Sequence, residues 1–455
     1  MAATQSGAGS NTGSNKSAGA PYDLIVKNGL VIDGTGAEPR VEDVAVKDGR
    51  IAARGPNLSA AGAGEVIDAE GKWVTPGLLD IHTHFDLEVE LDPALCEAVR
   101  HGTTTVLMSN CSLGVVYGAQ RRNGEDPIVD CFARVENMPK PVLKKVADLA
   151  TWTSSAEYYE HLDHLPLGVN VVPMIPHSML RAEVMGLKES VTREPTPDEM
   201  ARMEDLLRTA MDEGYIGFST DALPFHFLSE DPNRRTKIPS QFGGYAELKR
   251  LTAILRERDR VWQATPPKDS PLAVFRNFLL TSGRLFGKPL NVTAVAAMDV
   301  ASNRSLKKLA LALTWIFNSP LLKGNFRFQA LAARFKLYWD GPVNPLAEEI
   351  PELRELNELD LEDREGRRAI LTDPAFRARF AKMWMTGKTG FGLARLQRAM
   401  KAERLAFDRD FAEMVFHSGG PKVWAGETFR AVHDRYRAWR ADPAFARDED
   451  ERAAF

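Results

Sequence analysis

The stretch Leu78-Leu-Asp-Ile-His-Thr-His-Phe-Asp86 decides the fold of this chain, because it joins an apolar run to two closely spaced histidines. The run follows the turn signal Pro76-Gly77 and is typical of a buried strand. Residues i and i+2 of a strand point to one face, so the imidazoles of His82 and His84 can reach one metal ion. Burying two histidines costs desolvation free energy unless a partner binds them. We therefore predict a metal site at the end of this strand; the alternative is a pair of hydrogen-bonded core histidines.

Strands alternate with helices from residue 76 onward, which favours parallel β/α units. One helix opens with Thr196-Pro-Asp-Glu199, a capping box with proline at the first helical position. The expected strands are 76–84, 103–109, 170–175, 215–219, 260–264, 290–297 and 325–331. The predicted fold class is therefore α/β, a (β/α)8 TIM-like barrel with a small N-terminal β domain and no clear strand eight. Phe411–His417 is either a short strand eight or, as we prefer, a surface segment.

Residues 22–75 carry three hairpin signals, at Asn28-Gly29, at Asp48-Gly49 and around Gly71. They predict a small antiparallel domain of the β-sandwich type. The expected division of the chain is a disordered tail at 1–21, the β domain at 22–75, the barrel at 76–339 and a charged, helical region at 340–455.

Composition excludes several classes of protein. The chain has 455 residues, 44% of them hydrophobic and 26% charged, which are ordinary values for a globular protein. A net charge of -4 gives no reason to expect a nucleic-acid partner. No apolar run is long enough to span a bilayer, and the N-terminal tail lacks the apolar core of a secretory signal. Three cysteines do not make a disulfide framework, so the expected location is the reducing cytoplasm.

Cys111 is the third candidate metal ligand. It follows the expected second strand, and active sites of β/α barrels lie where strand C-terminal ends meet the following loops. A thiolate beside two imidazoles makes an N/N/S set that suits zinc. The alternative is a free core cysteine, but the adjacent histidines favour a ligand. Cys96, in a helix, and Cys131, in a loop, are expected to be structural.

The ends of the third and fourth strands add candidates for substrate binding and proton transfer. His177 follows strand three, where a pocket role and a packing role are equally open, and Arg181 is a candidate partner for a substrate carboxylate. Asp221 ends strand four and His226 follows it, so either can face the pocket. Asp221 can alternatively cap a turn.

Strands five and six end at Gln263 and near Asp299. Glutamine is a poor zinc ligand but can hold a substrate carbonyl or amide. Asp299 is a candidate base or ligand; alternatively, Asp299 or Ser302 caps the next helix.

Five segments carry a family resemblance. They are Asn28–Gly36, Val46–Ala52, Thr75–His84, Gly102–Val106 with Asn110-Cys111, and Gly214–Thr220. Together they resemble the amidohydrolase superfamily, and most of all its D-aminoacylase (N-acyl-D-amino-acid deacylase) group. The resemblance covers residues 22–220 well and is looser beyond them. It implies a metal-dependent hydrolase barrel beside a small β domain, with His82, His84 and Cys111 at the metal positions of one or two zinc ions.

The chain also departs from the family pattern. The family places histidines at the ends of strands five and six, where this chain has Gln263 and Ala297-Met298. The family's aspartate after strand eight, and the C-terminal strands that finish the β domain, have no clear counterpart before Phe455. We therefore expect one zinc ion rather than two. A barrel open between strands seven and one exposes unpaired strand edges, which predicts a homo-oligomer or a completing chain.

The predicted function is metal-dependent hydrolysis of a non-peptide C–N amide bond in a small molecule, most specifically an N-acyl-D-amino acid. Zinc would polarise the carbonyl and lower the pKa of bound water. A carboxylate, for which Asp221 and Asp299 are the candidates, would accept the proton of water and later protonate the leaving amine. One alternative is a cyclic-amide hydrolase of the hydantoinase kind. Such enzymes have a modified lysine at the end of strand four, whereas the first lysine after that strand here is Lys237. The other is a barrel that has lost its chemistry and serves as a binding or partner subunit.

Overall fold

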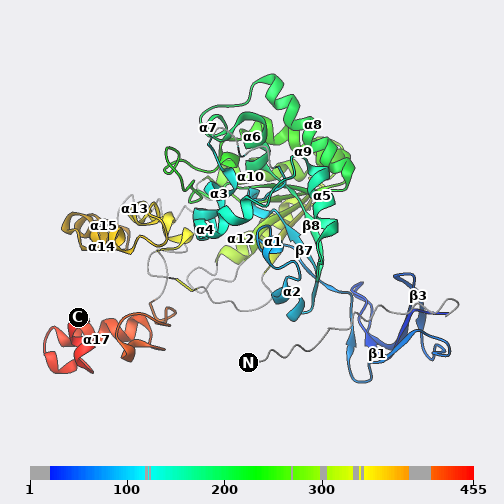
Figure 1. The fold of residues 1–455 in the computed structure, drawn as a ribbon, viewed down its shortest axis with the longest axis horizontal. Coiled ribbons are helices and arrows are strands. Elements are labelled where there is room, and N and C mark those ends of the chain that lie inside the picture. The colour runs from blue at the N-terminus through cyan, green and yellow to red at the C-terminus, as the bar shows by residue number, and fades with distance from the viewer. Residues whose placement is uncertain are drawn as a thin grey trace, which may run out of the picture. The chain divides into compact units, whose positions relative to one another are not determined.

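The computed structural model describes residues 21–117, 121, 124–267, 270–297, 305–330, 338–339, 343–388 and 411–455. The chain divides into two compact units, Met1–Leu78 and Leu79–Phe455 (Figure 1). The tail expected at 1–21 lies outside the described residues except for Pro21. Within the described ranges, no helix combines the length and the apolar character needed to cross a bilayer.

A five-stranded sheet forms the first unit. Its strands are β1 (Leu24–Val31), β2 (Arg40–Lys47), β3 (Arg50–Gly55), β4 (Glu65–Asp68) and β5 (Trp73–Val74). Their order is β3-β2-β1-β4, and β5 also pairs with β1. The hairpin predicted at Asp48-Gly49 is confirmed, because these two residues have φ angles of 49° and 70° and join the antiparallel strands β2 and β3.

The two other predicted hairpins in this unit are wrong. Asn28-Gly29 lies inside β1, where Asn28 has a φ of 60° and the register shifts between Val26 and Gly29. The Asp43 carboxylate stabilises this bulge by accepting the Asn28 N–H at 2.8 Å. Gly71 separates β4 from β5, but each of these strands runs parallel to β1. The sheet is therefore mixed, not antiparallel.

The parallel strands expected after residue 76 are present in chain order. They are β6 (Leu78–Asp80), β7 (Thr103–Met108), β8 (Asn170–Pro173), β9 (Ile175–Pro176), β10 (Gly217–Thr220), β11 (Val261–Ala264), β12 (Asn291–Ala297) and β13 (Asn325–Ala330). They form two sheets, β6-β7-β8 and β13-β12-β11-β10-β9. Met174 separates β8 from β9, which are two pieces of the third expected strand. The registered pairs in both sheets are parallel, which confirms the α/β class.

Helices lie between most successive strands of the second unit and also follow β13, and α8 packs against both α5 and α9 (Figure 1). The helices are α1 (Glu88–Leu91), α2 (Cys96–Arg100), α3 (Pro127–Val135), α4 (Lys140–Ala147), α5 (Ser155–His164), α6 (His177–Met185), α7 (Leu187–Ser190), α8 (Pro197–Glu213), α9 (Tyr245–Glu257), α10 (Pro271–Phe278), α11 (Gly283–Phe286), α12 (Ser305–Phe317), α13 (Arg354–Asn357), α14 (Arg364–Thr372), α15 (Pro374–Lys388), α17 (Phe429–Trp439) and α18 (Glu449–Ala454). The predicted capping box of α8 is confirmed, because Thr196 and Glu199 each accept the backbone N–H of the other.

Residues 271–286 form two helices, α10 and α11, because Ser282 has an extended backbone and its side chain caps α11. One expectation about the helices is corrected. Cys131 lies in α3 and is fully buried, whereas a loop position was expected.

Aromatic side chains fill the core between the longer sheet and its helices. Trp262 of β11 and Phe326 of β13 both pack on Phe278 of α10, with ring centroids 5.8 and 4.9 Å apart. All three rings are almost fully buried. Burial of one such side chain stabilises a fold by roughly 1.5–3 kcal/mol, so this core holds the strand ends in fixed positions.

A buried ion pair connects the region after β13 to α3. The Arg134 guanidinium donates to both carboxylate oxygens of Glu348, at 2.6 and 2.7 Å. Farther along, Val415 forms one isolated antiparallel bridge with Thr428. The segment 411–417 is therefore not an eighth parallel strand, in agreement with the preferred interpretation of its sequence.

Candidate metal centre

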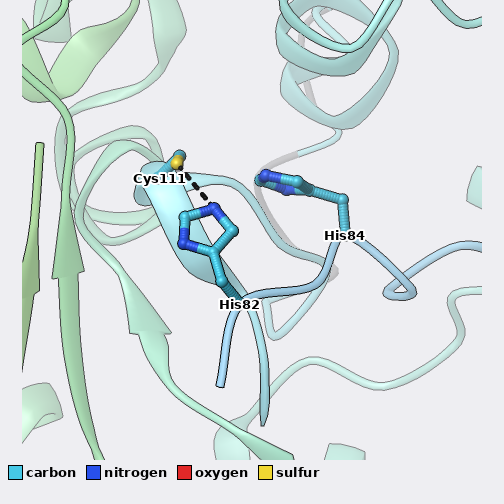
Figure 2. A group of neighbouring side chains, drawn as sticks. All are labelled: His82, His84 and Cys111. Atoms are coloured by element: carbon cyan, nitrogen blue, oxygen red, sulfur yellow. Dashed lines mark hydrogen bonds between the residues drawn. The ribbon is translucent and has the colours of Figure 1, made fainter. Parts of the chain in front are cut away.

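His82, His84 and Cys111 form one cluster of donor atoms (Figure 2). One ligand atom from each residue lies within 4.8 Å of the other two. The Cys111 sulfur is 3.3 Å from His82 Nε2, and the two imidazole centroids are 5.4 Å apart. Among the His, Cys, Asp and Glu side chains that the structure describes, this is the group of three that can hold a metal ion.

The two histidines lie directly after β6 and not within it, because β6 ends at Asp80. The backbone stays paired with β7 at Thr83, whose N–H and Oγ1 both donate to the Leu107 carbonyl, at 3.2 and 2.7 Å. Thr83 thus faces β7, while His82 and His84 on either side of it face Cys111 (Figure 2). The i, i+2 relation predicted from the sequence is therefore present, although both histidines lie beyond the end of β6 and not inside a strand that reaches residue 84.

Cys111 lies in a short 3-10 turn, Asn110–Ser112, after β7. Three residues around it have left-handed backbones, with φ angles of 63° at Ser109, 50° at Cys111 and 68° at Ser112. Each such conformation costs a non-glycine residue on the order of 1–3 kcal/mol, and such strain is concentrated at functional sites. The surrounding structure therefore has to hold this turn in place.

Polar side chains from three parts of the chain hold the turn. The Asp86 carboxylate accepts the N–H and the hydroxyl of Ser109, at 3.0 and 2.6 Å. Gln263 Oε1, at the end of β11, accepts the Cys111 N–H at 2.9 Å. Ser219 of β10 accepts the N–H of Ser112 at 3.1 Å and donates to the carbonyl of Ser109. The position of the sulfur is thus fixed by the ends of neighbouring strands.

Two further side chains contact the histidines, and neither was predicted from the sequence. Gln329 Oε1 lies 2.7 Å from His82 Nδ1, and Glu136 Oε1 lies 3.4 Å from His84 Nε2. Gln329 lies at the C-terminal end of β13, the seventh strand expected from the sequence. Because polar residues at the C-terminal ends of barrel strands form the active site, its position in the sequence could have marked it as a candidate. Glu136 is the C-cap residue of α3, where the helix dipole disfavours an anion. An acidic residue at this end of a helix is the sequence feature that could have indicated a functional role.

Burial sets the charges of these groups. Burial, helped by the neighbouring imidazole, lowers the pKa of His82 to about 4, and burial likewise lowers the pKa of His84 to about 4, so both rings are neutral near pH 7. Burial raises the pKa of the Cys111 thiol well above its ordinary value. It also raises the pKa of Glu136 to about 7.

The donor set fits a zinc ion. Two neutral imidazoles and one sulfur are the ligands that zinc prefers, and three protein ligands leave a fourth position open. His84 Nδ1 is buried without a hydrogen-bond partner, which costs free energy unless the ring binds something. A bound cation also favours the thiolate of Cys111 over the thiol.

We expect zinc affinity to rise about tenfold per pH unit above pH 7.5, because one proton must leave when zinc binds. Both histidines are already neutral there and Glu136, with a pKa of about 7, is mostly ionised, so the Cys111 thiol supplies most of that proton. Titration calorimetry in buffers of different ionisation enthalpy measures the release. Cys111→Ser is the control; an equally steep pH dependence in that variant would contradict the assignment of the proton.

Asp221 and His226 form a buried pair beside the cluster, with 3.0 Å between Asp221 Oδ1 and His226 Nδ1. Burial opposes a charge on His226, but the Asp221 carboxylate prevails and raises its pKa. The carboxylate also accepts the Thr265 hydroxyl at 2.9 Å and the Gln241 amide at 3.1 Å. Because Asp221 is buried and fully hydrogen-bonded, it holds its neighbours in place and does not offer a free oxygen.

His177 and Arg181 belong to a separate buried network. His177 Nε2 and Arg181 Nη1 contact the two carboxylate oxygens of Glu247, at 2.6 and 2.5 Å, and His177 Nδ1 contacts Ser240 at 3.0 Å. Arg181 is 0% exposed. In this conformation the structure therefore gives these two side chains internal partners, not a substrate.

Of the last two candidate site residues, Gln263 and Asp299, the structure describes only Gln263. Gln263 lies against the cluster, and its Nε2 is buried without a hydrogen-bond partner. Its orientation is fixed, because only an oxygen can accept the Cys111 N–H. Asp299, like the alternative cap Ser302, lies outside the described residues.

Comparisons with known proteins identify relatives of this chain. Residues 65–266 match the model of the amidohydrolase family. The chain is 37% identical over 423 residues to an uncharacterised protein of Mycobacterium tuberculosis (strain ATCC 25618 / H37Rv), a match that covers 91% of this chain and 65% of that protein. It is 34% identical over 349 residues to a D-aminoacylase of Alcaligenes xylosoxydans xylosoxydans, covering 70% of this chain and 67% of the enzyme.

Solved structures of deacylases are also similar to this chain. The fold is similar to an N-acyl-D-glutamate deacylase from Bordetella bronchiseptica in complex with zinc and a phosphonate mimic of the tetrahedral intermediate, with a TM-score of 0.51 and 25% identity. It is also similar to a D-aminoacylase with a binuclear metal centre, with a TM-score of 0.50 and 27% identity. Each match covers 68% of this chain and 58% of the other. The chain thus spans less than two thirds of the length of these structures.

Proposed function

This chain belongs to the D-aminoacylase group of the amidohydrolase family, and on that premise we propose that it hydrolyses the amide bond of an N-acyl amino acid, most specifically of the D series. His82, His84 and Cys111 would hold one zinc ion, and the series of parallel strands would form the wall of a TIM-like barrel. The observation that carries the proposal is the convergence of two neutral imidazoles and a cysteine sulfur at the ends of β6 and β7. Bound there, zinc supplies a Lewis acid for the carbonyl and acidifies water.

Gln263 is the candidate for binding the substrate carbonyl. Its oxygen accepts the Cys111 N–H, so its amide N–H group remains available beside the cluster. A buried donor without a partner costs roughly 1–3 kcal/mol, which a substrate carbonyl or amide oxygen would recover. The family usually has a histidine at this position, and glutamine can replace its hydrogen bond to a carbonyl oxygen but is a poor zinc ligand.

Glu136 is the carboxylate that we assign to proton transfer, in place of Asp221. Its side chain is 23% exposed, and its Oε1 lies 3.4 Å from His84 Nε2. Asp221, by contrast, is buried and fully hydrogen-bonded. In the first step Glu136 accepts a proton from the water that attacks the carbonyl carbon. In the second, it returns that proton to the nitrogen as the C–N bond breaks, giving an amine and a carboxylic acid, which then loses its own proton to solvent.

A substrate survey tests this function. Zinc-loaded protein is expected to release free amine from N-acetyl-D-amino acids with neutral or acidic side chains, and to act more slowly on their L enantiomers. Because Arg181 is buried, neutral N-acyl amines without a carboxylate belong in the same survey. Ring opening of hydantoins without release of amine would favour the cyclic-amide alternative. If the protein binds no zinc and its Tm is unchanged by a chelator, both the N-acyl amino acid hydrolase and the cyclic-amide hydrolase would be contradicted.

A further inference from the structure

We infer that Gln329 is a positioning residue that sets the tautomer of His82 and so decides whether this ring can bind a metal ion. Gln329 ends β13, and its side chain is almost completely buried. Its Oε1 lies 2.7 Å from His82 Nδ1, and its Nε2 donates to the Thr293 hydroxyl at 3.0 Å. The inference rests on the proposed zinc centre, but its first test does not.

The tautomer matters because a neutral imidazole carries one proton on one of its two nitrogens. With Oε1 of Gln329 accepting, the proton is on Nδ1 and the lone pair is on Nε2. His82 Nε2 is the atom that faces the Cys111 sulfur, at 3.3 Å. In this state the ring presents a lone pair to the same space as the sulfur, which is the state that a metal ligand requires.

The opposite state is accessible through rotation of the Gln329 amide by half a turn. The NH2 group would then donate to His82 Nδ1, and the ring proton would move to Nε2, where it blocks a metal ion. Thr293 permits both states, because a hydroxyl can donate as well as accept. A carboxylate at this position could only accept, whereas an aliphatic side chain could do neither.

The contact also joins the two parallel sheets. Gln329 belongs to β13, at one end of the five-stranded sheet, and His82 follows β6, at the end of the three-stranded sheet. A shift of β13 away from β6 would break the hydrogen bond and release the His82 tautomer. The metal affinity of the site is therefore linked to the approach of the first and last described strands of the series.

The first test measures the tautomer in metal-free protein by 15N NMR of labelled histidine, with His82→Ala to assign the signal. We expect the Nδ1–H form of His82 in the original chain and in Gln329→Glu. In Gln329→Leu we expect the Nε2–H form, which an unconstrained histidine prefers. His161 is the internal control, because its Nε2 pairs with Glu90 at 2.7 Å and its signal should not change.

The second test measures zinc affinity and thermal stability of the same variants. Loss of an outer partner typically costs a metal site 10- to 100-fold in affinity, so Gln329→Leu should weaken zinc by about that factor. Gln329→Glu should bind zinc at least as tightly as the original chain, because the carboxylate still accepts a hydrogen bond from His82 Nδ1. If Gln329 had only a structural role, both variants would be expected to lose zinc affinity.

Two results would overturn the inference: an unchanged His82 tautomer in Gln329→Leu, or an equal loss of zinc in both variants. If Gln329→Leu fails to fold, Gln329→Glu still decides, because weaker zinc binding by a folded Gln329→Glu protein contradicts the acceptor role. If the original chain binds no zinc at all, the proposed function fails, while the tautomer measurement still decides the inference.

Discussion

Replacing Cys111 by alanine is expected to strip zinc from the protein and to abolish amide hydrolysis. The sulfur is the one donor of the cluster that becomes an anion, and the two imidazoles that remain are both neutral. The loss of zinc affinity should exceed the roughly 100-fold that removal of an outer partner costs at most in typical metal sites. Zinc content after dialysis against a competing chelator, together with a calorimetric Kd, measures the effect.

The other two cysteines provide matched controls. Cys131 is fully buried in α3, so Cys131→Ala should lower thermal stability but retain zinc. Cys96 is exposed on α2, so Cys96→Ala should change neither quantity. A Cys111→Ala protein that keeps one zinc ion per chain would show that the metal, if any, binds elsewhere.

Features that depend on residues close together in the chain were predictable from the sequence. The capping box of α8 needs only the contacts of Thr196 with Glu199, and both residues are in the motif itself. Likewise, His82 and His84 are two residues apart, so one extended segment is sufficient to align them. Cys111 joined them because parallel strands bring their C-terminal ends to one edge.

Features decided by distant partners were not predictable. Asn28-Gly29 is a strong hairpin signal, but the Asp43 carboxylate of the neighbouring strand holds Asn28 in a bulge of a continuous strand. Arg181 is a plausible anion-binding residue in sequence, but Glu247, on a helix that begins far along the chain, neutralises it. His82 and Gln329 are 247 positions apart, and nothing local to either residue indicates their hydrogen bond.

Replacing Glu136 by glutamine is expected to lower kcat by about 10²- to 10⁴-fold, the usual contribution of a general acid–base group, while zinc remains bound. Glutamine keeps the size of the side chain and its contact with His84, but it can neither accept the proton of water nor return one to the leaving nitrogen. KM should change little, because Glu136 has no part in the proposed binding of the carbonyl by Gln263. Steady-state kinetics on the best substrate of the survey, with zinc content measured on the same samples, provides the data.

The pH profile gives an independent sign. A general base works when it is deprotonated, so kcat/KM of the original chain should rise with pH as Glu136 ionises. Burial places its pKa at about 7, and a bound cation lowers that value, so the midpoint should lie below 7. Glu136→Gln should lose this acidic limb of the profile, whereas a structural defect would lower the whole profile evenly.

A matched control comes from another helix. Glu213 also ends a helix, α8, but it is exposed, so Glu213→Gln should retain full activity and the same pH profile. Glu136→Asp keeps the carboxylate but withdraws it by one methylene, so its activity should lie between the original chain and Glu136→Gln. If Glu136→Gln loses its zinc, Glu136 acts as a ligand; if it keeps both zinc and activity, the proton is carried by another group. Either result would contradict the assignment, because the assignment requires lost turnover at an intact metal centre.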